Sequence, residues 1–542
     1  MESAGIRDAG KKTEFEGEQV MDNAGESIRR TCCPSHSSDR HNGITRRGFL
    51  KGVGGAGVLG SALTGLNWET LSAVEDKSSG RQRRAIIVSP ILLYETPQRK
   101  HQTSWRNWGG IQTEDDAKKE VARIEKELKS LAAIADFPVR FADVARVRNV
   151  GELTRVSEAG KADVFIVYAA GGWMDTLDAI AKSGKPVIIF CRHKSGPVYL
   201  WYEIISPRYL RRHTDTLAVK NFDEGDVVID SQDELLWRLR ALCGLLNTMG
   251  TRVVAIGGPD AWSQPKGVVP ELVKTKWQFD MPTYSYNDLG NLIKEARGDS
   301  AAVGRAAERA KAYLNQSGCK LQTDRKFVEN AFLLEDVLRR VMDKSDCQAI
   351  TINGCMGTIM PLAETSACLT LSLLNDAGYL AFCESDFVVI PSGVLLANIS
   401  GKPVFLNDPT YPHDGVITLA HCTAPRKMDG KKLEPAIIFT HFESDYGAAP
   451  KVEMRKGQVV TNIAPDFQVK RWVGFIGKID DVPFLDICRS QIDIRFKCDS
   501  RLLAERMPGF HWMMCYGDYM KETGYALKKV GIQWEDLTTK PA

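Results

Sequence analysis

PLAETSACLTLSLLNDAGYLAFCESDFVVIPS, residues 361–392, is the stretch of sequence that decides the fold. Its first half is almost wholly apolar from Ala367 to Leu374, a pattern that predicts a buried helix. Gly378 follows, and glycine suits the left-handed conformation in which many helices end. The next apolar run, Tyr379 to Cys383, predicts a strand buried on both faces, as in a parallel sheet. The stretch therefore predicts an α/β fold.

Carboxylates lie at the two ends of this helix–strand unit. Glu364 precedes the helix, and Glu384 and Asp386 follow the strand. Ligands of open α/β sheets collect at the carboxyl ends of strands, where Glu384 and Asp386 would emerge. If the strand geometry continued, these two side chains would point to the same side. The structural alternative is that Glu364 complements a helix N-terminus and the other two cap the next helix.

The bulk composition is that of an ordinary globular protein. The chain has 542 residues, which is enough for roughly three domains. Its net charge is only +3 and no basic block dominates, so we expect no nucleic-acid partner. The 13 cysteines are scattered without the spacing of zinc ligands, which indicates buried thiols rather than a disulfide framework.

The N-terminal part resembles an export address. Residues 1–44 are polar without hydrophobic periodicity, which predicts disorder. The segment 45–75 resembles a twin-arginine signal, since Arg46-Arg47 is followed by GFLK and a short Gly/Ala-rich apolar run. The alternative is a chance arginine pair before an apolar helix. The resemblance implies a bacterial protein that the twin-arginine export machinery carries, already folded, to the periplasm or another extracytoplasmic location.

Three domains follow this segment. Strand-like runs such as AIIVSPILLYE and KPVIIFCRH alternate with helical patterns and predict a Rossmann-like parallel sheet. The first strand lacks GxGxxG, which excludes a dinucleotide site. After Pro403 strand-like runs dominate, which predicts a mainly β domain, with a small barrel as one possible form. The predicted fold is two Rossmann-like α/β domains followed by a mainly β C-terminal domain, at residues 84–220, 225–404 and 405–542.

Three further side chains are candidates for a site. Trp173 follows a strand at the expected ligand edge, where it would stack on a sugar face or pack against a helix. His421 ends the apolar run ITLAHC, and His511 lies in MPGFHWMMCYGDYM. Taken alone, either histidine is a hydrogen-bonded structural residue or a ligand.

In their order along the chain, several short motifs resemble the L-fucose/L-arabinose isomerase family. They are AFCESD at 381–386 preceded by Glu364, GKPVFLND at 401–408, HC at 421–422 and GFHWMMCYGD at 509–518. The likeness is best from about residue 345 onward and only architectural before that. It implies Mn²⁺ or another divalent metal, an aldose–ketose interconversion of a free sugar through an enediol, and a homo-oligomer.

The resemblance also implies roles for individual residues. Glu364, Asp386 and His511 would bind the metal, and Glu364 and Asp386 would also be the catalytic acid and base. Oxygen ligands with one imidazole suit manganese, which would polarise the sugar carbonyl while carboxylates move a proton between C1 and C2. Glu384, His421 and Trp173 would contact the substrate, although Glu384 is also a candidate ligand, base or support for the ligands.

Two departures keep alternatives open. Sugar isomerases normally act on intracellular sugars, whereas this chain carries an export-like segment, and the family's sugar-binding residues have no match in the N-terminal half. The first alternative is another metal-dependent enzyme acting on a sugar or sugar acid, of the epimerase type. The second is a non-catalytic extracytoplasmic sugar-binding protein, which needs no convergence of Glu364, Asp386 and His511.

Overall fold

The computed structural model describes residues 81–159, 162–219 and 222–538. The predicted tail, 1–44, and the predicted signal segment, 45–75, lie outside these residues. Among the described helices, none is by itself long and apolar enough to cross a membrane, and one bent pair, Cys355–Ala363 with Ala367–Asp376, meets the length and composition only when its two halves are joined.

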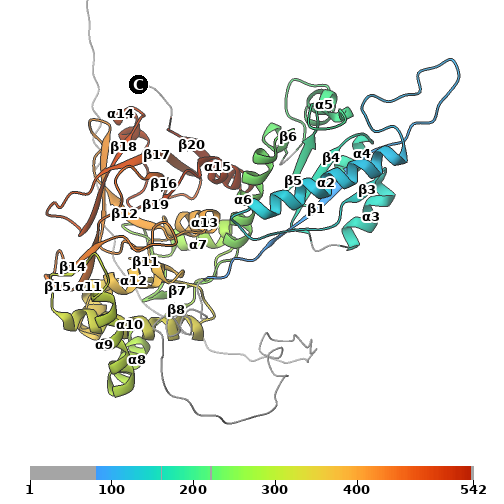
Figure 1. Ribbon diagram of the computed structural model, residues 1–542. Coiled ribbons are helices and arrows are strands. Elements are labelled where there is room, and N and C mark those ends of the chain that lie inside the picture. The colour runs from blue at the N-terminus through green and yellow to red at the C-terminus, as the bar shows by residue number, and fades with distance from the viewer. Residues whose placement is uncertain (1–80, 160–161, 220–221, 539–542) are drawn as a thin grey trace, which may run out of the picture. The chain divides into compact units, whose positions relative to one another are not determined.

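The first sheet is parallel throughout, as predicted (Figure 1). Its strand order is β2-β1-β4-β5-β6, and β3 pairs with the end of β1. The strands are β1 (Ile86–Leu93), β2 (Val139–Phe141), β3 (Ala145–Val147), β4 (Val164–Ala169), β5 (Val187–Cys191) and β6 (Val227–Ile229). The connecting helices are α2 (Glu114–Ile134), α3 (Val150–Ala159), α4 (Met174–Ala181) and α5 (Leu200–Ile204).

The boundary between the first two α/β units differs from the predicted one. The strand near residue 227 was expected to open the second unit, but β6 pairs with β5 of the first sheet. Helix α6 (Gln232–Thr248) is capped by Ser231, and its Leu235 and Leu239 join the hydrophobic core of the first sheet. Local pattern identifies such a strand correctly but does not say which sheet it joins.

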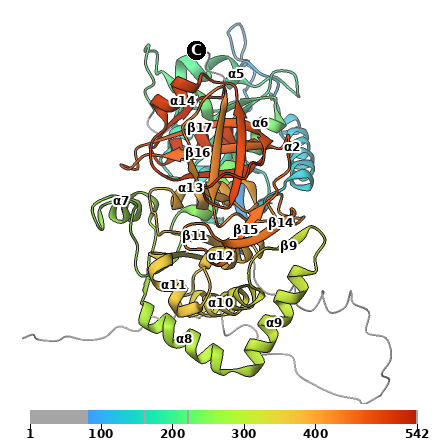
Figure 2. The same ribbon diagram turned by 90° about the vertical axis from the view of Figure 1, so that its left-hand side faces the viewer.

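The second sheet is also parallel, with the order β11-β10-β7-β8. Its strands are β7 (Val253–Ile256), β8 (Thr283–Tyr284), β10 (Ala349–Ile352) and β11 (Leu380–Cys383). The helices of this unit are α7 (Val268–Trp277), α8 (Tyr286–Gly298), α9 (Ser300–Leu314), α10 (Arg325–Lys344), α11 (Cys355–Ala363), α12 (Ala367–Asp376) and α13 (Ile390–Ser400) (Figure 2).

The stretch that decides the fold forms the predicted helix and strand, α12 and β11. Gly378 has a φ of +88°, the left-handed conformation expected after the helix. Asn375 connects the two elements, since its Nδ2 donates to the carbonyls of Leu371 (3.0 Å) and Ala381 (2.7 Å). Its Oδ1 accepts from the backbone N–H of Ala381 (3.2 Å). A buried side chain therefore fixes where the helix ends and the strand begins.

The C-terminal part contains an antiparallel barrel, which confirms the predicted mainly β unit. Strands β16-β19-β12-β13-β18-β17 are neighbours in this order, and the pairing of β16 with β17 closes the ring. β20 adds to β17 in parallel. The elements are β12 (Phe405–Pro409), β13 (Val416–His421), β16 (Val459–Pro465), β17 (Arg471–Asp481), β18 (Ser490–Phe496), α14 (Ser500–Arg506), β19 (Trp512–Tyr516), α15 (Met520–Lys529) and β20 (Gln533–Asp536).

A small three-stranded sheet contains strands from both sides of the predicted boundary at 405. Its order is β15-β14-β9, with β14 (Ala436–His441), β15 (Tyr446–Val452) and β9 (Cys319–Leu321). β9 comes from the α/β part of the chain and pairs in parallel with β14. A strand that lies more than a hundred residues before β14 in the sequence thus completes this part of the β region.

Candidate functional site

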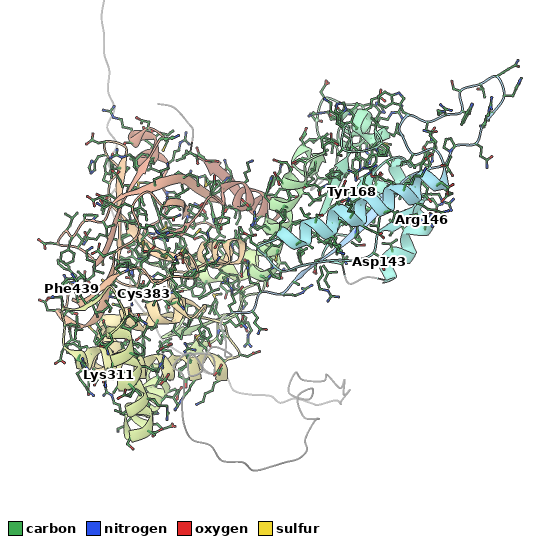
Figure 3. All side chains as sticks on the ribbon, viewed as in Figure 1. Asp143, Arg146, Tyr168, Lys311, Cys383 and Phe439 are labelled. Carbon is green, nitrogen blue, oxygen red and sulfur yellow. The ribbon has the colours of Figure 1, made fainter. Side chains whose placement is uncertain are left out.

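The site begins where β11 ends. Cys383 is the last residue of this strand (Figure 3). The next two residues leave strand geometry, because Glu384 has a φ of +64° and Ser385 a φ of +48°. A left-handed conformation at a residue other than glycine is costly and tends to occur at functional sites. The hydroxyl of Thr351 on β10 holds this turn by accepting from the backbone N–H of Ser385 (3.1 Å).

The barrel contributes three side chains from adjacent strands. β12 lies between β19 and β13, with Asn407 opposite Trp512 and Asp408 opposite Ala420. His511 directly precedes Trp512, and His421 directly follows Ala420. Asp408 therefore lies near both histidines. The strand register brings together three positions that are far apart in the sequence.

These groups converge around one imidazole. His511 Nε2 lies 3.3 Å from Glu384 Oε2 and 3.2 Å from Asp408 Oδ1. His421 Nε2 lies 3.7 Å from Glu384 Oε1. Donor atoms of Glu384, His421 and His511 all fall within 4.8 Å of one another. Two carboxylates and two imidazoles thus meet in one place.

Asp386 holds the imidazole from behind. Its Oδ2 accepts from His511 Nδ1 (2.7 Å), and its Oδ1 accepts from the backbone N–H of Val388 (3.0 Å). The side chain of Asp386 is only 1% exposed, whereas those of Glu384 and Asp408 are 37% and 33% exposed. A carboxylate on one nitrogen of a ligating histidine fixes the tautomer whose other nitrogen can bind a metal. Asp386 is therefore placed to orient His511 rather than to bind a metal itself.

The donor atoms that lie close enough together for one cation are those of Glu384, His421 and His511, and Asp408 Oδ1 lies 3.2 Å from His511 Nε2. His511 Nε2 and Asp408 Oδ1 are both buried, lie 3.2 Å apart, and yet have no hydrogen-bond partner within the described part of the chain. Buried polar atoms without partners are rare and require an explanation such as an ion. Two carboxylates and one imidazole are a donor set suited to manganese.

The carboxylates and imidazoles of the site also shift one another's pKa values. Burial alone would lower the pKa of His511, but the nearby carboxylates of Asp386, Asp408 and Glu384 outweigh burial and raise the pKa to about 11. Burial would raise the pKa of Glu384, but interactions with His421 and His511 hold it well below its usual range. The two shifts favour an ionised Glu384 next to a positively charged group.

The structure does not bring Glu364 to this group. Glu364 ends α11 with a φ of +48°, its side chain is 57% exposed, and Oε1 accepts from Arg297 (2.8 Å). Its backbone carbonyl accepts from Asn330 (3.0 Å). The roles predicted for Glu364, as metal ligand and acid/base, came from the family resemblance, and the structure places this side chain with Arg297 instead of with His511.

Trp173 also lies away from the cluster. It is the exposed residue before α4, and it lines a different cavity next to Trp108 and Trp201 in the first α/β unit. The predicted His421 does lie at the cluster, where Thr423 Oγ1 is 3.0 Å from its Nδ1. Glu384 and His511 lie at the centre of the cluster.

A cavity of about 520 Å³ opens onto the cluster. Glu384, Asp408 and His421 line it. Trp262 and Phe510 form one wall, and their rings stack with centroids 3.8 Å apart and planes 3° from parallel. Both rings are more than a third exposed. An exposed aromatic face beside polar groups is a surface on which the apolar face of a sugar ring can stack.

Sequence reasoning missed Asp408, Trp262 and Phe510. Asp408 ends the motif GKPVFLND, so an aspartate directly after an apolar strand was the available signal. Trp262 follows GGPDA after the strand VVAI, again at the carboxyl end of a strand. Their position relative to His511 depends on strand pairing, which the local sequence does not show.

Known proteins give no direct assignment of this site. No model of a known protein family matches the chain, and a search of curated proteins finds no significant match.

Proposed function

We propose that this protein is a divalent-metal enzyme, with Mn²⁺ as the expected ion, that interconverts a free aldose and ketose through an enediol. The observation that carries the proposal is the orphaned Nε2 of His511, which faces Glu384 and Asp408 at the edge of a sugar-sized cavity. The ordered motifs that resemble the L-fucose/L-arabinose isomerase family support it. The family's two Rossmann-like domains and β domain agree with the observed parallel sheets and barrel.

Glu384, Asp408 and His511 would hold the metal. When bound, such an ion acts as a Lewis acid that polarises a sugar carbonyl. Asp386 keeps His511 in the tautomer that leaves Nε2 available. The proposed ligands, Glu384, Asp408 and His511, replace the set predicted from the sequence, which was Glu364, Asp386 and His511.

The remaining groups are placed to bind the sugar and move a proton. Glu384 Oε2 faces His511, and Oε1 faces His421. We assign Oε1 the transfer of a proton between C1 and C2, with His421 stabilising the ionised form of Glu384. Trp262 and Phe510 would stack on the ring and limit access of water.

The first experiment measures metal content of the full chain after exposure to Mn²⁺ and removal of free metal. We expect about one ion per chain in the wild type and loss of this ion in Asp408→Asn. Asp414→Asn is the matched control, because Asp414 lies in the same region but is 97% exposed. Absence of bound metal in the wild type would contradict the proposal.

The second experiment separates the isomerase from its rivals. Aldoses are incubated with the metal-loaded protein in D₂O, and the products are identified. An isomerase yields a ketose that has gained deuterium from solvent at C1. An epimerase of the kind considered above yields an epimer without accumulating ketose, and a sugar-binding protein yields neither. Either of the last two results would overturn the proposed reaction.

A further inference from the structure

A second group of metal-binding side chains lines the same cavity. Cys368, Cys422 and His441 each offer a donor atom, and these atoms all lie within 4.8 Å of one another. All three residues are buried, and all three line the cavity. None of them belongs to the group around His511.

The three residues come from separate elements. Cys368 is in the first turn of α12, Cys422 directly follows β13, and His441 ends β14. Cys488, in the loop before β18, packs against the same two cysteines, and its thiol interacts with that of Cys422. Four segments distant in sequence thus bring three thiols and one imidazole together, although their spacing along the chain is not that of a zinc motif.

The geometry points to a site for a soft divalent cation, Zn²⁺, held by Cys368, Cys422 and His441, with Cys488 as the fourth donor. Zinc–sulfur bonds are about 2.3 Å long, so two thiolates on one ion lie at most about 4.6 Å apart. The donor atoms of Cys368, Cys422 and His441 lie within 4.8 Å of one another, which is close to this limit. Binding would release the thiol protons of the ligating cysteines to solvent.

The imidazole of His441 is already oriented for this role. Its Nδ1 lies 3.1 Å from the hydroxyl of Ser444, which leaves Nε2 as the donor that a metal would use. A hydrogen bond at the opposite nitrogen is the usual support of a ligating histidine. If Cys368 and Cys422 served only as small apolar side chains in the core, they would not need a histidine held next to them in this way.

The two sites differ in their chemical preference. The oxygen-rich group of Glu384, Asp408 and His511 suits a hard ion such as manganese, whereas thiolates select zinc. Cys422 follows His421 directly in the chain, so zinc on Cys422 would anchor the end of β13 and with it the imidazole facing Glu384. This inference does not require the isomerase reaction, because it rests on a separate set of donors.

The test is a two-metal analysis of the full chain after exposure to Mn²⁺ and Zn²⁺ together. The wild type should retain both ions. Cys368→Ser should lose about one zinc per chain and keep manganese, whereas Asp408→Asn should lose manganese and keep zinc. Cys355→Ser is the matched control, because Cys355 is buried and lines the same cavity but lies outside the group.

Three results would overturn the second site. The first is that Asp408→Asn loses zinc while Cys368→Ser keeps it, because this would place the zinc in the first site. The second is a wild-type chain that binds no zinc, and a mass lower by two hydrogens would then show that two of its thiols have formed a disulfide. The third is a wild-type chain that takes up Co²⁺ without a thiolate-to-metal charge-transfer band. The cobalt spectrum needs no variant, so the test still decides if Cys368→Ser fails to fold.

Discussion

At the scale of single residues, Asp386 provides the sharpest test of how the site is divided. Replacing Asp386 by Asn puts an amide N–H₂ or a weaker acceptor against His511 Nδ1 and favours the tautomer with a proton on Nε2. We expect Mn²⁺ affinity to fall about 10- to 100-fold, the usual effect of losing such support. Calorimetric titration of the variant, with Asp414→Asn as control, measures this change. An unchanged affinity would show that Asp386 does not orient the ligand.

Asp376 gives a prediction for pH. Its Oδ1 accepts from the backbone N–H of Lys427 (2.7 Å), but its Oδ2 is buried without a partner in the described chain. Burial raises the pKa of Asp376 from 3.8 to about 7. Because the folded-state pKa lies above the unfolded value, the contribution to stability is present below about pH 4 and is lost as pH rises through about 7.

The corresponding variant is Asp376→Asn, which keeps the Oδ1 acceptor but cannot ionise. Its unfolding free energy should exceed that of the wild type by a few kcal/mol at pH 8 and approach it at pH 4, since each pKa unit corresponds to about 1.4 kcal/mol. Denaturant unfolding at the two pH values measures the difference. If the two proteins differ equally at both pH values, Asp376 does not titrate in this range.

At the scale of elements, Asn375 joins α12 to β11 through three hydrogen bonds. Asn375→Ala should lower the free energy of unfolding by about 2–4 kcal/mol, because it leaves buried backbone groups of Ala381 without partners. Asn315→Ala, at an exposed helix end, should change it by less than about 0.5 kcal/mol. Urea unfolding of both variants gives the comparison. Equal effects would mean that the connection contributes little.

The same scale shows what the sequence can predict. The apolar pattern of 367–383 predicts α12 and β11 correctly because both are buried locally and Gly378 ends the helix. It misplaces the side chains after β11, because the chain leaves strand geometry at Glu384. Asp386 is consequently turned toward the far side of His511. The periodicity of hydrophobic residues does not indicate that Glu384 and Ser385 adopt the left-handed conformation.

Asp408 shows the limit imposed by distance along the chain. A motif ending in this residue is visible in the sequence, but its role follows from the pairing of β12 with β19. The cysteine group was missed for the same reason, since spacing in the chain excluded zinc while the fold brings Cys368 and Cys422 together. The sequence predicts which residue types are present and where single helices and strands form. Which side chains from different elements come together is known only from the fold.

At the scale of the whole molecule, metal should couple the α/β and β parts of the chain. Glu384 follows a strand of the second sheet, whereas Asp408 and His511 belong to the barrel. A ligand at 100 times its Kd stabilises the folded state by about 2.7 kcal/mol. We expect a chelator to lower the melting temperature of the wild type by several degrees, measured by calorimetry. In protein loaded with Mn²⁺ alone, Asp408→Asn should melt at the same temperature with and without chelator, and a shift in this variant would place the bound manganese elsewhere.

The strand β9 makes this protein less modular than its linear order implies. Its three residues, Cys319–Leu321, complete the sheet of β14 and β15 although they precede the barrel by some eighty positions. A gene fragment cut at the apparent junction near 405 would encode β14 with an open edge, which invites pairing between chains. Recombination that exchanged the barrel for another would have to carry β9 with it, so the two halves are expected to be inherited together.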